Sequence, residues 1–244
     1  MSSFQGKVAV VTGGNKGIGL ETCRQLAELG FNVLLGSRDL GRGKTAADSL
    51  RQDGLNVHAL KLDVNSAADR SAVVQYITDE FGHLDALINN AGTILDRGVK
   101  PSEVSLDVLH QTFELNFFSV VALTQQLLPL IRKSPAGRIV NVSSNLASLT
   151  KHGDPKSDIY DVKYLAYNAS KASLNAFTLH LAHELRETPI KVNSAHPGWV
   201  KTTLGGEEAP MNVIDGAKTS VQLATLPADA PTGQFVHLGK TIPW

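Results

Sequence analysis

The chain of 244 residues carries, near its N-terminus, a glycine-rich turn between an apolar run and a segment of helical character. The turn reads Thr12-Gly13-Gly14-Asn15-Lys16-Gly17-Ile18-Gly19 and follows the run Val8–Val11. Glycine suits a sharp passage from strand to helix because it has no Cβ. The bare backbone N–H groups at the start of a helix attract phosphate. The stretch therefore predicts a strand–turn–helix that binds the pyrophosphate of a dinucleotide, although such a turn by itself is a weak signal.

Short apolar runs and helical segments alternate along the rest of the chain. The expected strands cover 8–11, 31–35, 57–62, 84–88, 138–142, 190–194 and 234–238, and the expected helices cover 17–29, 43–52, 66–81, 105–131, 167–186 and 217–226. Apolar strands that alternate with helices indicate a parallel sheet covered on both faces. Right-handed crossovers then give a single Rossmann-type, doubly wound α/β fold of about seven strands. We expect residues 1–244 to form one domain, with the cofactor half over about 1–135 and the catalytic and substrate half over about 136–244.

Composition narrows the class of protein. Hydrophobic residues make up 42% and charged residues 19% of the chain, and the formal net charge is zero, which argues against a nucleic-acid-binding surface. The single cysteine, Cys23, cannot form an intramolecular disulfide and falls inside the first expected helix, which favours a buried thiol. No apolar run reaches about 18 residues, and residues 1–6 do not resemble a signal peptide. We expect a cytoplasmic protein with neither a membrane segment nor a metal site.

Two cations point to the type of dinucleotide. NAD-preferring folds often place an acid at the end of the second strand, where this chain has Ser37 and Arg38. The guanidinium of Arg38 suits a 2′-phosphate, and Lys16 in the glycine turn could approach the same group. The sequence therefore predicts NADPH over NADH. Asp39 leaves an alternative open, since it could face a ribose or cap the next helix.

Two further strand ends are candidates for cofactor contact. Asp63 and Val64 close the third expected strand, where the carboxylate could accept from the adenine amino group and the valine could line the ring; the alternative for Asp63 is a helix cap. The stretch Asn89-Asn90-Ala91-Gly92 follows the fourth strand. Its small residues would let backbone approach the cofactor, and its amides could tie the strand end in place, but the stretch could also be an ordinary turn.

Tyr167 and Lys171 are the catalytic candidates. They are four residues apart and so share one helix face. A neighbouring ammonium and an oxidised nicotinamide both favour a phenolate and would lower the pKa of the tyrosine. Ser143 and Ser144 follow the strand at 138–142 and offer a hydroxyl for a substrate carbonyl. Asn116 is a polar residue in an apolar stretch, either catalytic or a satisfied buried amide.

Taken in order, these motifs resemble those of the short-chain dehydrogenases/reductases, and most closely the carbonyl-reductase branch. The resemblance implies that Tyr167 is the general acid in carbonyl reduction, that Lys171 lowers its pKa and binds the ribose, that Ser144 rather than Ser143 orients the carbonyl, and that Asn116 holds a water in a proton relay. It also implies contacts at the nicotinamide end from Pro197, Gly198, Val200 and Thr202. The full set expected to bind NADPH/NADP+ is Gly13, Asn15, Lys16, Gly17, Ile18, Gly19, Arg38, Asp63, Val64, Asn89, Ala91, Gly92, Tyr167, Lys171, Pro197, Gly198, Val200 and Thr202.

The substrate is less well defined by the sequence. Trp199, Leu204 and Met211 fall in an expected lid, which favours an apolar or partly aromatic small-molecule carbonyl compound, and no charged residue obviously demands a charged one. Ser144 and Tyr167 are 23 positions apart, which departs from the common family pattern. The additional residues fall in Lys151–Lys163 and leave open whether the protein is a monomer or a homodimer. The alternatives are an oxoacyl-thioester reductase, a steroid or sugar alcohol dehydrogenase, or a non-catalytic NADP(H) sensor.

Overall fold

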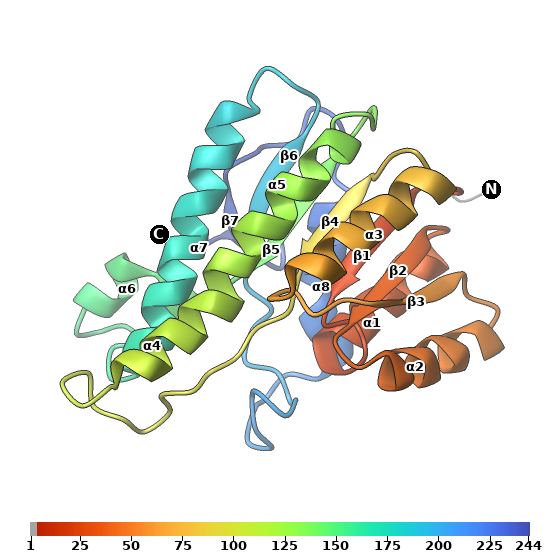
Figure 1. Cartoon of the computed structure of the whole chain (residues 1–244). Coiled ribbons are helices and arrows are strands. Elements are labelled where there is room, and N and C mark those ends of the chain that lie inside the picture. The colour runs from red at the N-terminus through yellow and green to blue at the C-terminus, as the bar shows by residue number, and fades with distance from the viewer. Residues whose placement is uncertain (1–3) are drawn as a thin grey trace.

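Strand β1 (Val8–Thr12) lies inside a single eight-stranded sheet in the computed structural model, which describes residues 4–244 (Figure 1). The expectation about the N-terminal segment falls partly on residues 1–3, which lie outside the described part. The strand order is β3-β2-β1-β4-β5-β6-β7-β8, and all neighbours are parallel except β7 and β8. The remaining strands are β2 (Asn32–Ser37), β3 (Val57–Lys61), β4 (Ala86–Asn89), β5 (Arg138–Val142), β6 (Lys191–Ala195), β7 (Phe235–His237) and β8 (Lys240–Thr241).

The doubly wound parallel sheet is confirmed, with one strand more than the seven expected runs. The additional strand, β8, has only two residues and turns back on β7 through Leu238 and Gly239, both at positive φ. Two residues are too few to show an alternating pattern, so the sequence gives no sign of this strand.

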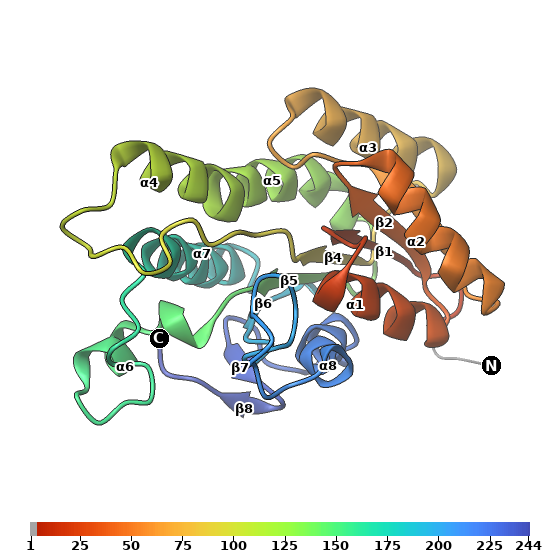
Figure 2. The ribbon, with the colours of Figure 1, turned by 90° about the horizontal axis from the view of Figure 1, so that it is seen from below.

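Helices cover both faces of the sheet. They are α1 (Gly17–Glu28), α2 (Leu40–Gln52), α3 (Ala67–Glu80), α4 (Leu106–Phe113), α5 (Ser119–Ile131), α6 (Leu149–Gly153), α7 (Leu165–Glu184) and α8 (Val213–Ala224), with a π-helical turn η1 (Glu114–Phe118) and a 3-10 turn η2 (Asn145–Ala147). Figure 2 shows α5 and α7 on one side of the sheet and α1 and α8 on the other.

Alternation along β1 explains the two layers of core. Ala9 and Val11 belong to the hydrophobic cluster shared with α1, α2 and α8, whereas Val8 and Val10 belong to the cluster shared with α3, α5 and α7. Successive side chains of a strand point to opposite faces, so a run that is apolar throughout needs helices on both. The strand order reverses direction between β1 and β4, and ligands of such sheets bind at the carboxyl ends of the strands beside this point.

Side-chain caps explain where several helices begin. Asp39 accepts from the Arg42 N–H and starts α2 at Leu40, three residues earlier than expected, and Asn212 caps α8 in the same way. Ser66 and Ser105 cap α3 and α4. The first residue of α1 is preceded by Lys16, which makes no side-chain cap, and α7 has no cap from its own N-terminal residue. Both of these exceptions lie at the candidate site.

The helix expected over 105–131 forms, but one π turn interrupts it. Over Leu106–Ile131 the chain is long and apolar enough to cross a membrane by length and composition alone, a test that the core helix of a soluble domain also passes. In this structure α5 packs Leu123, Leu127 and Ile131 into the core against α3 and α7. We therefore interpret the apolar character of α5 as that of a core helix.

Candidate active site

The glycine turn between β1 and α1 has the geometry of a phosphate cradle. Gly13 and Gly17 have φ of 63° and 55°, a conformation that favours glycine. A Cβ on Gly19 would lie 2.4 Å from the Gly13 carbonyl oxygen, so the turn has no room for a side chain there. Asn90 holds the turn in place, because its Nδ2 donates to the Thr12 carbonyl at 2.8 Å and its main-chain N–H donates to the Thr12 hydroxyl.

The first turn of α1 presents backbone N–H groups without a side-chain cap. A helix N-terminus of this kind attracts an anion through its unpaired N–H groups and its dipole. The absence of a cap at α1, where α2, α3, α4 and α8 each have a side-chain cap, is the observation that fits a bound pyrophosphate. Asn15, Lys16 and Ile18 surround this terminus, as the sequence predicted, and their contact with a cofactor stays a prediction.

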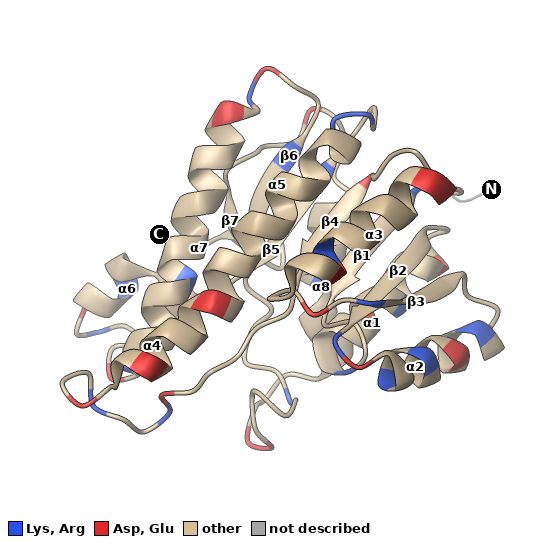
Figure 3. Ribbon diagram, viewed as in Figure 1, with Lys and Arg blue, Asp and Glu red and all other residues tan. Residues whose placement is uncertain are grey.

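Lys16 and Arg38 are exposed and form no side-chain hydrogen bond or ion pair with any residue of the described part, 4–244. Lys16 follows β1 and Arg38 follows β2, and these adjacent strands pair in register with Thr12 opposite Gly36. In Figure 3 the positive and negative charges are interspersed along α2, so this is not a broad basic face. Asp39 caps α2 and pairs with Arg42 at 3.6 Å, which settles its role as the helix cap.

The side chains predicted to contact the cofactor at the ends of β3 and β4 differ in how far they are already engaged within the protein. One carboxylate oxygen of Asp63 accepts from the Asn65 N–H, while Ser66 is the cap of α3, so Asp63 is not that cap. Val64 is largely buried among the residues of the α3 side. Asn89 is turned into the core, where it donates to Thr124 and Asn141. It therefore ties the strand end in place, and contact with a cofactor is left to its main chain and to the neighbouring Ala91.

Tyr167 and Ser144 meet at the carboxyl edge of the sheet. Tyr167 lies in the first turn of α7, and its side chain interacts with that of Ser144, which follows β5. Burial raises the pKa of Tyr167, and the bond to Ser144 and the charge of Arg97 oppose that rise. The neighbouring Ser143 has a buried hydroxyl without a partner in the described residues. The geometry thus brings Ser144, and not Ser143, to the tyrosine.

Lys171 is buried one turn further along α7. Its Nζ donates to the Val142 carbonyl at 2.7 Å and lies 6.0 Å from the centre of the Tyr167 ring. Burial lowers the pKa of Lys171 from 10.5 to about 8. A Cβ added to Gly92 would come within 3.4 Å of the Lys171 Nζ, so the glycine leaves room for the ammonium beside the loop after β4.

Asn116 lies in the π turn and is fully buried. Its amide nitrogen donates to the Thr93 carbonyl at 2.9 Å and to Ser170 at 3.0 Å, and its oxygen accepts from the Thr93 N–H at 2.9 Å. These contacts satisfy the side chain and bind the loop after β4 to α7. Single π turns are common at functional sites. The structure thus shows the satisfied buried amide and leaves the water-holding role a prediction.

The segment after β6 closes over the glycine turn. A Cβ on Gly17 would lie 3.3 Å from the Thr202 methyl, so the two segments are in contact. Gly198 has φ of 92° and packs over Met211. The side chain of Val200 is buried against Gly216 of α8. Contact of Pro197, Gly198, Val200 and Thr202 with a nicotinamide stays a prediction.

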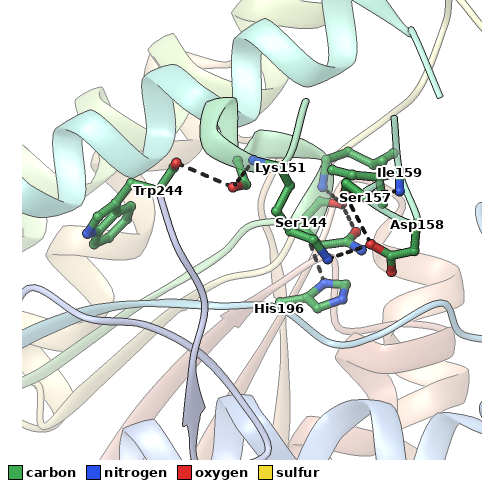
Figure 4. A network of polar contacts seen from close by, with 10 residues as sticks. Ser144, Lys151, Ser157, Asp158, Ile159, His196 and Trp244 are labelled. Atoms are coloured by element: carbon green, nitrogen blue, oxygen red, sulfur yellow. Dashed lines mark hydrogen bonds and ion pairs between the residues drawn. The ribbon is translucent and has the colours of Figure 1, made fainter. Parts of the chain in front are cut away.

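His196 links the segment after β6 to the loop after β5, which carries Ser144 (Figure 4). Its Nδ1 accepts from the Asn145 N–H at 3.2 Å and from the Gly198 N–H at 3.4 Å. Burial lowers the pKa of His196 to about 3, which keeps the ring neutral and the nitrogen free to accept. Apart from its place next to Pro197, no sequence signal singles out His196.

The irregular stretch 151–163 packs beside the same loop. His152 contacts the Leu146 carbonyl at 3.0 Å, and Lys151 pairs with Asp158 at 2.7 Å. The main-chain oxygen of Trp244 accepts from Ser148 and Thr150, as Figure 4 shows in part, which places Trp244 against the residues directly before this stretch. The stretch 151–163 therefore lies beside the loop that carries Ser144.

Asp96 and Arg97 were not selected from the sequence, yet they reach the site. Asp96 is completely buried and accepts from the Ala166 N–H at 2.6 Å, which supplies α7 with the cap that its own N-terminal residue lacks. Arg97 lies over the Tyr164 ring at 5.8 Å. The available signal was a pair of charged residues in the loop that follows Asn-Asn-Ala-Gly. No sequence pattern indicated that this loop contacts α7, 70 positions further along the chain.

Comparisons with known proteins show the family to which the chain is similar. The family model described as short chain dehydrogenase matches residues 7–212. The chain is 34% identical to short-chain dehydrogenase/reductase 1 of Saponaria officinalis, over all of this chain and 98% of that protein. It is 33% identical to carbonyl reductase [NADPH] 1 of Mus musculus, over 97% of this chain and 98% of that protein.

Solved structures show the same arrangement. The NADPH-bound carbonyl reductase from chicken fatty liver superposes with a TM-score of 0.85 at 26% identity, covering 98% of this chain and all of that one. Salutaridine reductase from Papaver somniferum superposes with a TM-score of 0.81 at 30% identity, covering 94% and 99%.

Proposed function

The chain belongs to the short-chain dehydrogenase/reductase family, and within that family we propose that it is an NADPH-dependent carbonyl reductase with Tyr167 as the general acid. The observation that carries the proposal is the interaction of the buried Tyr167 side chain with Ser144, one helical turn from the buried Lys171. The relatives named carbonyl reductase [NADPH] and the whole-length similarity support it.

The residues of this chain fit the cofactor. The uncapped N-terminus of α1 and the glycine turn would hold the pyrophosphate, and the unpaired cations Lys16 and Arg38 would bind the 2′-phosphate. Asp63 and Val64 would border the adenine, and the segment from Pro197 to Thr202 the nicotinamide. When bound, NADPH supplies the hydride that the carbonyl carbon accepts.

The side chains perform the proton chemistry. Ser144 donates a hydrogen bond to the carbonyl oxygen and orients it toward the Tyr167 hydroxyl. The phenol gives its proton to that oxygen, and because burial raises the pKa of Tyr167 the proton is present at neutral pH. Lys171 binds the cofactor ribose and stabilises the phenolate that remains. Asn116 holds the loop and α7 together and positions a water that returns the proton.

The substrate we propose is a small aldehyde or ketone with an apolar body. Trp199 and Leu204 expose 55% and 39% of their surface on the segment that closes over the site, which offers apolar contact to a ligand. An oxoacyl-thioester reductase, or a steroid or sugar alcohol dehydrogenase, would use the same side chains. Only assays with different substrates distinguish these activities from the proposed one. A non-catalytic sensor is disfavoured because the whole set of polar groups is present and assembled.

The test is NADPH oxidation across aromatic aldehydes, diketones and quinones, with Tyr167→Phe as the paired variant. We expect turnover by the natural chain and a loss of at least about a hundredfold in the variant, with NADPH binding retained, since the phenol contributes general acid catalysis. Ser143→Ala, which removes the unpartnered neighbouring hydroxyl, is the control and should keep the activity. Full activity of Tyr167→Phe would refute the mechanism.

A further inference from the structure

Arg97 is a cation at the mouth of the active site. Its Nη2 donates to the Leu204 carbonyl at 2.6 Å, and its guanidinium carbon lies 5.8 Å from the centre of the Tyr164 ring. The first contact belongs to the segment that closes over the glycine turn and the second to the residue that precedes α7. Arg97 therefore bridges the segment that closes over the glycine turn and the N-terminal end of α7, which carries Tyr167.

The position of Arg97 is set by its neighbour. Asp96 is completely buried, and its carboxylate accepts from the Ala166 N–H at 2.6 Å. Ala166 directly precedes Tyr167, so this bond anchors the loop after β4 to the turn that carries the general acid. Asp96 points inward and Arg97 outward, and the guanidinium is held near Tyr167 although its own side chain is exposed.

The charge of Arg97 reaches the reacting group. Burial raises the pKa of Tyr167, and Arg97 is one of the two groups that oppose the rise. A carbonyl compound that receives the proton of Tyr167 thus lies within the field of the guanidinium.

No acid neutralises Arg97 within the described residues 4–244, since none of their ion pairs includes it. One of its five N–H donors is used by Leu204, and the planar fork of a guanidinium matches a carboxylate. An arginine kept only to hold the closing segment would need the bond to Leu204 alone. The unused donors and the uncompensated charge point to a ligand.

We propose that Arg97 binds an anionic group of the substrate, so that the enzyme prefers carbonyl compounds that carry a carboxylate over their neutral analogues. This rests on the proposed carbonyl reductase function and narrows its substrate class to an apolar aldehyde or ketone with one acidic group. Trp199 and Leu204 contact the apolar body, Ser144 and Tyr167 the carbonyl oxygen, and Arg97 the acid.

The experiment compares two benzaldehydes of nearly equal shape, one with a carboxylate and one with a carboxamide at the 3-position, and repeats the comparison at the 4-position. The measured quantity is the ratio of kcat/KM for acid over amide, at low and at high salt. A charge-assisted bidentate contact predicts a ratio of about ten or more for the natural chain at one of the positions, and a fall at high salt. Arg97→Gln should reduce the ratio to about one, and Arg97→Lys should keep part of it.

Lys100→Gln is the matched control, because Lys100 lies on the same loop and pairs with Glu103 at 3.4 Å. It removes one positive charge and should leave the ratio unchanged. A role of Arg97 in holding the closing segment would lower kcat/KM for acid and amide alike, and the ratio would then stay constant in Arg97→Gln. That result, or a ratio of one or less in the natural chain at both positions while amides are reduced, would overturn the proposal and leave the carbonyl reductase function standing. Absence of NADPH oxidation with every carbonyl compound would instead refute the proposed function itself.

Discussion

Between about pH 7 and pH 9.5, the free energy of unfolding should rise less with pH in Lys171→Met than in the natural chain. Lys171 is 4% exposed, and burial lowers its pKa from 10.5 to about 8. In the unfolded chain the group keeps the ordinary value. Between about pH 8 and pH 10.5 the unfolded chain therefore binds more protons than the folded one, and the free energy of unfolding rises with pH. Methionine has no proton to bind and lacks this dependence.

The magnitude follows from the size of the shift. One pKa unit corresponds to about 1.4 kcal/mol, so integration between about pH 7 and pH 9.5 gives the natural chain a gain of about 2 kcal/mol over Lys171→Met. The bond from Nζ to the Val142 carbonyl is lost in the variant at every pH, which offsets the two curves without changing their slopes. Because burial raises the pKa of Tyr167 above its ordinary value, the phenol stays protonated in both folded chains over this range, and the titration of groups distant from Lys171 cancels in the difference.

Urea unfolding at several pH values, followed by circular dichroism, measures this difference. Both chains should be studied without cofactor, because NADPH binding would stabilise only the folded state. The same variant should lose its reductase activity, because Lys171 is proposed to stabilise the phenolate. Parallel stability curves for the two chains from about pH 7 to pH 9.5 would refute the inference that the buried lysine carries a depressed pKa.

Two further predictions concern the cofactor and the loop contacts. Reversing the charge of Lys16 or Arg38 to glutamate should raise the KM for NADPH by at least about tenfold and change that for NADH little, because only NADPH carries the 2′-phosphate; equal losses with both cofactors would contradict this. His196→Ala should lower kcat/KM by about tenfold through loss of its two hydrogen bonds, and His196→Asn, whose amide oxygen can take the place of Nδ1, should recover most of it. Equal activities of the two variants would show that these bonds do not position the loops.

Much of the fold could be predicted because its signals are local. Apolar runs such as Val8–Val11, which need cover on both faces, indicated a parallel sheet with helices on each side, and the observed strand order agrees. The helix starts were less accurate, since Asp39 and Asn212 could each be interpreted as loop residues until their cap bonds were seen. The short turn at 145–147 and the helix α6 have too few residues to show a period.

The candidate catalytic residues were also evident from the sequence, because a tyrosine and a lysine four apart share a helix face wherever that helix lies. Their surroundings were not. From the residues alone Ser143 and Ser144 were equal candidates, and the family resemblance favoured Ser144; in the structure it is Ser144 that interacts with Tyr167. It likewise left Asp39 between two roles, which the bond to Arg42 decides.

The sequence by itself thus determined the strand–turn–helix at Gly13–Gly19, the layered α/β architecture and the types of side chain at the site, since each depends on residues within a few positions of one another. Only the tertiary structure placed Asp96 on the N-terminus of α7 and Arg97 against Leu204, because those contacts join residues 70 and 107 positions apart. Hydrophobic period carries no information about such pairs, which arise when the loops after β4 and β6 converge at the carboxyl edge of the sheet. The types of side chain at the candidate site are therefore evident from local sequence, whereas the proposed substrate preference depends on contacts between distant loops.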